Sequence, residues 1–195
     1  MSETINALLE KIKRLETELE SEIEGQATKF KYKLEGTNAI FDEAVLNAHR
    51  NLRVSIPSWL KSSLFRNIAS VPFIYPMLVP IAFMDLTVTM YQHICFRLYG
   101  ISRVKRSKYV VMDRHQLSYL NAIEKLNCLY CGYGNGVIAY AREVFAKTEQ
   151  YWCPIKHARK ALGRHKRYND FVDFGDAKDY ETKALKFRNA MSDED

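Results

Sequence analysis

The sequence predicts a mainly α-helical protein, and three observations support that class. Glycine and proline are scarce, with 8 and 5 copies among 195 residues, whereas good helix formers are common. Apolar residues recur at helical spacing near both ends of the chain. A long apolar segment lies between them. We therefore divide the chain into four regions: 1–57, 58–100, 101–168 and an acidic C-terminal tail, 169–195.

The first region is predicted to begin with an amphipathic helix that carries a short heptad pattern. Its apolar residues alternate at steps of three and four: Ile5, Leu8, Ile12, Leu15 and Leu19. This is the pattern of a coiled-coil seam, although it covers only about two to three heptads. We expect either a homo-oligomer formed through this helix or packing of the helix on its own chain. Helical spacing continues over residues 26–56, with Phe30 on the apolar side, a break at Gly36 and Thr37, and an end at Pro57.

The second region holds the longest apolar segment. No lysine or arginine lies between Arg66 and Arg97, and Asp85 is the only acid there. The apolar core VPFIYPMLVPIAFM is 14 residues long. A single membrane span needs roughly 20 residues, so the whole segment is long enough to enter a bilayer. We expect membrane association, with a buried pair of core helices in a soluble protein as the alternative.

Prolines and flanking charges favour a segment that enters and leaves the membrane on one side. Pro72, Pro76 and Pro80 each remove a helical hydrogen-bond donor. Lys61 and Arg66 precede the segment. The basic residues after it are Arg97, Arg103, Lys105, Arg106 and Lys108. The positive-inside rule places both flanks on the cytoplasmic side. We therefore expect a re-entrant or interfacial helical hairpin with both termini cytoplasmic, and one straight span as the alternative.

The charge of the chain bears on its partners. A net charge of +6 suits anionic membrane lipid or nucleic acid. Basic residues beside the apolar segment favour lipid, at about 1 kcal/mol per charge near the surface. Nucleic acid is less favoured, because few base-reading side chains accompany the basic run at 156–168. Asp85 and His93 are intramembrane functional candidates if they lie in lipid. The alternative places them at the head groups or facing protein.

The third region contains further helix patterns. A short extended piece is expected at 109–112, followed by helical spacing over 117–126 and a second helix over 136–152. The residues expected on the apolar side of that second helix are Val137, Tyr140, Ala141, Val144 and Phe145. In the tail, Tyr180, Leu185 and Phe187 predict a short docked helix.

Three cysteines and a histidine in this region have the spacing of metal ligands. The pattern C-x2-C-x21-C-x3-H comprises Cys128, Cys131, Cys153 and His157. Thiolate and imidazole together bind zinc tetrahedrally. We expect the first pair to lie in a tight turn helped by Gly132, and the second pair to share one helical turn with Pro154 at its start. Zinc is the expected cofactor, with iron or an iron–sulfur cluster as the alternative; a disulfide or scattered core residues would need no metal. His115 is a possible further ligand.

Residues 128–133, CLYCGY, resemble the C-x-x-C-G-Y knuckle of rubredoxins and zinc ribbons. A knuckle followed by ligands on a helix is similar to a treble-clef zinc site. These resemblances imply a bound zinc or iron. The string REVFAKTEQYWCPIKHAR resembles a bacterial membrane-associated family, which implies the inner membrane and no particular activity.

The expected function follows from the closed ligand set and the apolar segment. Four protein ligands close a zinc site, and closed sites are structural. The chain carries no Walker glycine loop, no H-E-x-x-H and no G-x-S-x-G, so we name no catalytic residue. We expect a metal-binding scaffold or accessory protein that oligomerises or recruits a protein partner at the inner membrane face. The alternatives are an iron-containing electron-transfer accessory and a membrane enzyme that uses Asp85, His93 or His115.

Overall fold

The computed structural model describes residues 3–29, 32–35, 38–62 and 65–192. Two compact units make up the chain. The first comprises residues 1–61 and 113–126, and the second comprises 62–112 and 127–195. Helices predominate in both units, which confirms the predicted mainly α class.

The first unit begins with the predicted N-terminal helix, α1 (Glu3–Lys29). Four residues of the heptad pattern are more than half exposed in this single chain: Leu8, Ile12, Leu15 and Leu19. The side chain of Ile5 is outside the described part of the structure. The helix is confirmed, and self-association through its apolar stripe stays a prediction.

A β-hairpin follows α1, where a helix was predicted. Strands β1 (Tyr32–Glu35) and β2 (Asn38–Phe41) pair antiparallel, with Tyr32 opposite Phe41. Phe30 and the predicted break at Gly36 and Thr37 lie outside the described residues. Helices α2 (Glu43–Asn51) and α3 (Ile56–Ser62) come next. Pro57 is the second residue of α3 rather than the end of a helix, because proline is well tolerated in a first turn.

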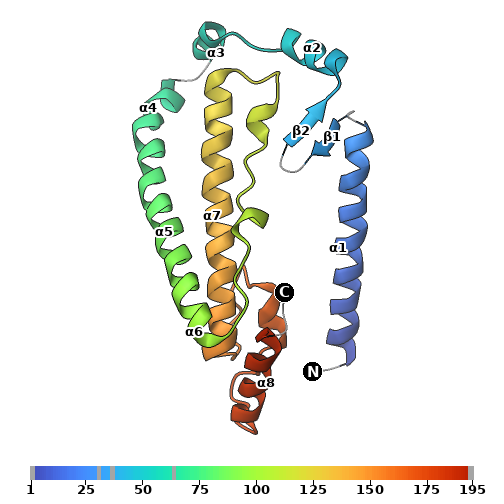
Figure 1. Ribbon diagram of the computed structural model, residues 1–195, viewed down its shortest axis with the longest axis vertical. Helices are drawn as coiled ribbons and strands as arrows, with labels where there is room; N and C mark the ends of the chain where they lie inside the picture. The colour runs from blue at the N-terminus through green and yellow to red at the C-terminus, as the bar shows by residue number, and fades with distance from the viewer. Residues whose placement is uncertain (1–2, 30–31, 36–37, 63–64, 193–195) are drawn as a thin grey trace. The chain divides into compact units, whose positions relative to one another are not determined.

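The second unit starts with a helical run of 35 residues, Phe65–Tyr99. It consists of α4 (Phe65–Ile74), a 3₁₀ turn (Tyr75–Met77), α5 (Leu78–Tyr91), a π-helical turn (Gln92–Phe96) and α6 (Arg97–Tyr99). Figure 1 shows that the run does not reverse direction. The predicted helical hairpin is therefore wrong. Pro76 lies in the 3₁₀ turn and Pro80 in the first turn of α5, so neither proline interrupts the helix where a backbone donor is required.

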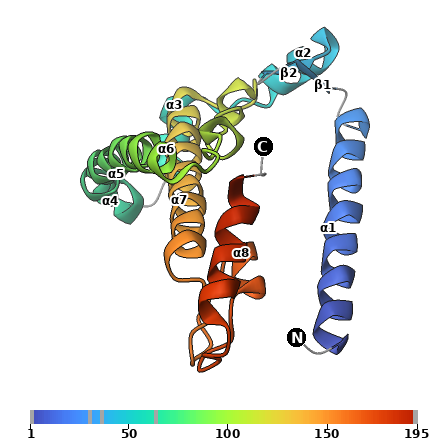
Figure 2. The same ribbon diagram turned by 60° about the horizontal axis from the view of Figure 1, so that its bottom comes forward.

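Helix α7 (Ala122–Trp152) runs alongside α4–α6 in the same direction (Figures 1 and 2). Near the start of the pair, the Tyr75 hydroxyl donates to Asn127 Oδ1 at 2.6 Å. Near its end, the rings of Tyr99 and Tyr151 stack with centroids 4.7 Å apart. Gly100 ends α6 at φ 69°, a left-handed conformation that glycine adopts without strain. The chain then returns through a segment without α-helix, residues 100–121, to the start of α7.

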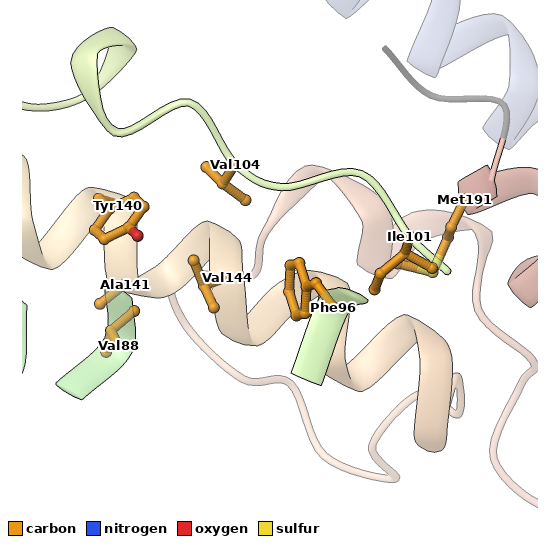
Figure 3. Close-up of a cluster of buried hydrophobic side chains, with 8 residues drawn as sticks. All are labelled: Val88, Phe96, Ile101, Val104, Tyr140, Ala141, Val144 and Met191. Atoms are coloured by element: carbon orange, nitrogen blue, oxygen red, sulfur yellow. The ribbon is translucent and has the colours of Figure 1, made fainter. Parts of the chain in front are cut away.

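The core of the second unit lies between α5, the π-helical turn, the return segment and α7 (Figure 3). Phe96, Tyr140, Val144 and Met191 are fully buried there. The predicted apolar side of α7 is confirmed for Val137, Tyr140, Ala141 and Val144. Phe145 is instead 57% exposed.

The C-terminal part closes one end of the second unit. Residues Ile155 and Val172 form a parallel β-bridge, and a 3₁₀ turn spans Lys166–Asp170. Helix α8 (Tyr180–Ser192) confirms the predicted short helix and docks on α7 through Arg188 Nε, which donates to the Tyr151 carbonyl at 2.7 Å.

Candidate functional site

The helical run α4–α6 exposes an unusual amount of apolar surface. It is long and apolar enough to cross a membrane, yet only 11% of its most apolar stretch is buried in the structure. A core helix of a soluble protein with this composition would be mostly buried. We define the apolar face as the following residues, each more than half exposed: Phe65, Phe73, Val79, Phe83, Leu86, Met90, Ile94 and Leu98.

The apolar face has a neighbour on α7. Ile138, Phe145 and Trp152 are each more than half exposed and lie seven residues apart, which keeps them on one side of the helix. The ring of Phe145 stacks on Tyr91 of α5, with centroids 6.3 Å apart. This side of α7 therefore borders α5 and adds to the exposed apolar area.

Three polar residues of α5 and the π-helical turn, Asp85, Thr89 and Gln92, face protein, whereas Thr87 and His93 are exposed. Asp85 accepts hydrogen bonds from the return segment and from α7. Thr89 bonds to Tyr140 of α7, and Gln92 is only 2% exposed. A helix with polar groups inward and apolar groups outward reverses the pattern of a soluble protein, in which the apolar stripe faces the core. The outer side of this helix is therefore largely apolar.

Two residues, Arg106 and Tyr133, donate hydrogen bonds to the Asp85 carboxylate. Arg106 donates from Nε to Oδ1 at 2.8 Å and from Nη2 to Oδ2 at 2.6 Å. The Tyr133 hydroxyl donates to Oδ2 at 2.9 Å. The hydrogen bond to Asp85 raises the pKa of Arg106, and burial followed by the bond to Asp85 raises the pKa of Tyr133. Asp85 thus faces protein, and its charge is neutralised by a fixed guanidinium.

Gln92 fixes the return segment against the helix. Its Nε2 donates to the Val104 carbonyl at 3.3 Å, and its Oε1 accepts from the Val104 N–H at 3.0 Å. The same Nε2 lies 2.6 Å from the Tyr140 hydroxyl, which lies 3.2 Å from Thr89 Oγ1. The amide therefore pairs with both backbone groups of one residue, as a neighbouring strand would. This holds the residues around Val104 at a defined place beside α5.

Two glycines allow the return segment to lie close to α7. A Cβ atom at Gly136 would stand 2.8 Å from the Tyr109 carbonyl oxygen and 2.8 Å from Val110 Cα. At Gly132 it would stand 3.3 Å from the Val111 carbonyl oxygen. These positions are four residues apart, on one face of the helix. The glycines predicted to form a loop around a metal knuckle instead permit close backbone packing inside a helix.

The structure does not bring the four predicted metal ligands together. Cys128 and Cys131 lie in α7 near its start, and Cys153 directly follows its end. Cys131 and Cys153 are 22 positions apart along the helix, which corresponds to about 33 Å at 1.5 Å per residue. A zinc–sulfur bond is only about 2.3 Å long. Across the residues that the structure describes, no group of three or more His, Cys, Asp or Glu could hold a metal ion.

The local conformations also differ from those predicted for a metal site. The C-x-x-C pair is helical rather than in a tight turn, and residues 153–158 are not helical. His157 is exposed, and its ring stacks on Tyr168 with centroids 5.9 Å apart. These donors do not fit one zinc or iron ion in this fold. Metal binding by the set stays a prediction that requires α7 to be interrupted.

The remaining predicted residues lie at the surface of the second unit or in the first. Arg97, Arg103, Lys105 and Lys108 are exposed, whereas Arg106 is half-buried on Asp85. His93 is exposed, and its Nδ1 lies 2.7 Å from the Thr89 carbonyl oxygen. Because a carbonyl oxygen only accepts, Nδ1 is the donor of this hydrogen bond. His115 belongs to the first unit, in a 3₁₀ turn at Arg114–Gln116.

Sequence reasoning missed the hydrogen bonds that Gln92, Tyr133 and Tyr140 make between the elements of the second unit. Tyr133 was noted only as the last residue of the CLYCGY motif, Tyr140 was noted only on the apolar side of a helix, and Gln92 belongs to no motif. Only Gln92 could have been recognised as a candidate for a buried polar contact, because it is an uncharged polar residue close to the apolar core of the segment. No family model, curated protein or solved structure matches this chain.

Proposed function

We propose that this chain is a monotopic membrane protein that lies on an anionic membrane surface with its apolar face in one leaflet. There it acts as a scaffold or accessory for a protein partner. The observation that carries the proposal is the reversed polarity of α4–α6: eight large apolar side chains are exposed, while Asp85, Thr89 and Gln92 are turned toward protein.

The position of Arg106 supports a helix that lies along the membrane rather than across it. Asp85 is 20 residues after Phe65 and 14 before Tyr99, so it lies near the middle of the 35-residue run. Arg106 is bonded to it, and exposed Lys105 and Lys108 are within two residues of Arg106. A crossing helix would place these charges at the depth of the bilayer centre, at roughly 2.5–3.5 kcal/mol each. In the plane of the interface they reach anionic head groups instead, gaining about 1 kcal/mol each.

The size of the apolar face is sufficient for this attachment. Complete burial of a large apolar side chain is worth about 1.5–3 kcal/mol. Each of the eight residues transfers only its exposed part to lipid, so roughly 1 kcal/mol per residue is a suitable figure. The sum, on the order of 8 kcal/mol, corresponds to micromolar binding before orientation costs and electrostatic gains.

The scaffold role draws on the first unit. Leu8, Ile12, Leu15 and Leu19 form an exposed apolar stripe on α1 with coiled-coil spacing. Such a stripe binds another helix, either from a second copy or from a protein partner. Attachment through one unit and helix pairing through the other would concentrate partners at the membrane surface.

Vesicle flotation tests the attachment. The full chain, purified in detergent and mixed with preformed phosphatidylcholine vesicles, is expected to float with them. Phe83→Glu should abolish flotation, because a charge then enters the centre of the apolar face. Phe174→Glu is the matched control, since Phe174 is a phenylalanine of similar exposure outside that face, 69% against 66%. Equal flotation of the two variants would refute the proposal. Loss of a dimer without loss of flotation in Phe83→Glu would show that a second copy covers the face.

A further inference from the structure

An open cavity of about 490 Å³ lies beside the π-helical turn of the apolar helix. One wall comes from the helix and includes His93 and Thr89, and the other comes from the return segment. His93 lies between Met90 and Ile94 of the apolar face in sequence, three residues from one and one from the other. The cavity therefore opens at the border of the surface that we propose to contact lipid.

The charged side chains that line the cavity are all cationic. Arg103, Lys105 and Arg106 contribute to its wall together with His93, and no carboxylate does so. One of these cations, Arg106, is paired with Asp85 through its Nε and Nη2 groups. Within the described ranges, Arg103 and Lys105 have no ion pair with an acid. The cavity consequently presents uncompensated positive charge.

The return segment is rigidly placed at this wall. Ser102 accepts two hydrogen bonds from Lys147 Nζ, at its carbonyl (3.1 Å) and at Oγ (2.7 Å). Val104 is paired with Gln92 through both backbone groups, and Arg106 is paired with Asp85. Residues 102, 104 and 106 of the segment are thus each tied to a helix. In an extended chain the alternate residues, Arg103 and Lys105, project to one common side.

We propose that this cavity binds the phosphate group of a phosphate ester, with the head group of an anionic phospholipid as its source. Two adjacent cations and a histidine suit a phosphate, because charge-assisted hydrogen bonds to phosphate oxygens are strong and arginine forms them in pairs. The lipid source rests on the proposed attachment of the apolar face. Acyl chains covering Met90 and Ile94 would leave the head group next to His93.

The first arm of the test needs no membrane. Titration of the full chain in a nonionic detergent with glycerol 3-phosphate, followed by calorimetry, is expected to show saturable binding. Arg103→Gln with Lys105→Gln should weaken it by about five-fold per charge removed. Lys108→Gln with Arg114→Gln removes the same charge from exposed positions that do not line the cavity, and should leave binding unchanged. Arg103→Lys should retain most of the affinity. Melting temperatures of all variants are expected to match the original chain, because the substituted side chains are exposed.

The second arm uses vesicles of phosphatidylcholine with and without phosphatidic acid. The cavity variant is expected to lose more binding to the phosphatidic acid vesicles than the charge-matched control, and to bind pure phosphatidylcholine normally. Absence of glycerol 3-phosphate binding, or equal loss in both variants, would overturn the phosphate site. Binding of glycerol 3-phosphate without any difference on vesicles would reject the lipid source and assign a soluble phosphate ester. Failure of the chain to float on phosphatidylcholine would reject the proposed attachment but leave the first arm interpretable.

Discussion

Arg106 donates two hydrogen bonds to Asp85, a residue 21 positions earlier in the middle of the apolar helix. This pair sets the register of the return segment along α5. It also determines where the basic residues of that segment lie, beside the centre of the helix rather than beyond its end. The orientation that we propose at the membrane depends on this placement.

Replacing Asp85 with asparagine should destabilise the second unit. Asp85→Asn leaves the half-buried guanidinium of Arg106 without its anion, and the expected loss is about 1–3 kcal/mol in the free energy of unfolding. Chemical denaturation in detergent measures it. Asp173→Asn is the control, because Asp173 pairs with Lys156 at the surface and is 72% exposed. That loss should stay below about 1 kcal/mol. Equal losses would contradict the structural role of the Arg106 pair.

A methyl group at Gly136 should disrupt the packing of the return segment on α7. Gly136→Ala places Cβ 2.8 Å from two backbone atoms that cannot rotate away, so we expect a loss of roughly 1–3 kcal/mol. Gly134→Ala is the control in the same helix, since its Cβ would meet only the end of the Ile81 side chain at 3.4 Å. Alanine favours helix by about 1 kcal/mol over glycine there. In thermal unfolding, Gly134→Ala should have the highest melting temperature, the original chain an intermediate one and Gly136→Ala the lowest. Any other order would count against the close approach of the return segment to Gly136.

The apolar stripe of α1 should support self-association. Leu8→Asp with Leu15→Asp places two charges in the seam, and light scattering after gel filtration should then report a smaller particle. Ala7→Asp with Ser21→Asp adds the same charge at exposed positions outside the stripe and should leave the size unchanged. An original chain that is already monomeric would show that the stripe serves another purpose.

The positions of the cysteines lead to a prediction about metal. Because α7 separates Cys131 from Cys153 by about 33 Å, no single ion should bridge them. Protein purified anaerobically from Cys131→Ser or Cys153→Ser should therefore carry as much zinc and iron as the original chain. Elemental analysis and the visible spectrum measure this. One zinc or iron per chain that both substitutions remove would mean that α7 is interrupted in solution and that the predicted ligand set is real.

Periodicity alone identified the helices whose apolar residues repeat over several turns. Helix α1 and the second half of α7 were predicted in this way. Helix α8 was predicted from three apolar residues of the tail, and the apolar character of α4–α6 from composition. The hairpin of β1 and β2 was missed because strands of four residues are too short to display a clear alternation. Pro72, Pro76 and Pro80 were given too much weight. Pro76 and Pro80 lie where a helix does not need their backbone donors, and Pro72 lies inside α4 without ending the helical run.

The structure does not bring the four predicted metal ligands together, and the spacing that suggested a metal site is ambiguous. Cysteines three residues apart suit both a turn around an ion and one face of a helix. The glycines that followed seemed to favour a turn. Glycine is needed at 132 and 136 because the backbone of residues 109–111 lies against these positions. Such a tertiary contact cannot be recognised from the neighbouring sequence. For the same reason the Arg106–Asp85 pair could not be predicted from two residues 21 positions apart.

The depth of the apolar helix in the bilayer tests the central claim most directly. Nitroxide labels at Phe73→Cys, Leu86→Cys and Leu98→Cys, in a chain whose native cysteines are replaced by serine, report depth by power saturation with oxygen and a nickel chelate. Positions 73 and 98 are 25 residues apart, about 37 Å along the helix. A helix that lies in the interface gives all three labels the same shallow depth, and this is the result we predict. A label at Leu86 near the bilayer centre with Phe73 and Leu98 at opposite interfaces, or three labels without lipid contact, would contradict the account.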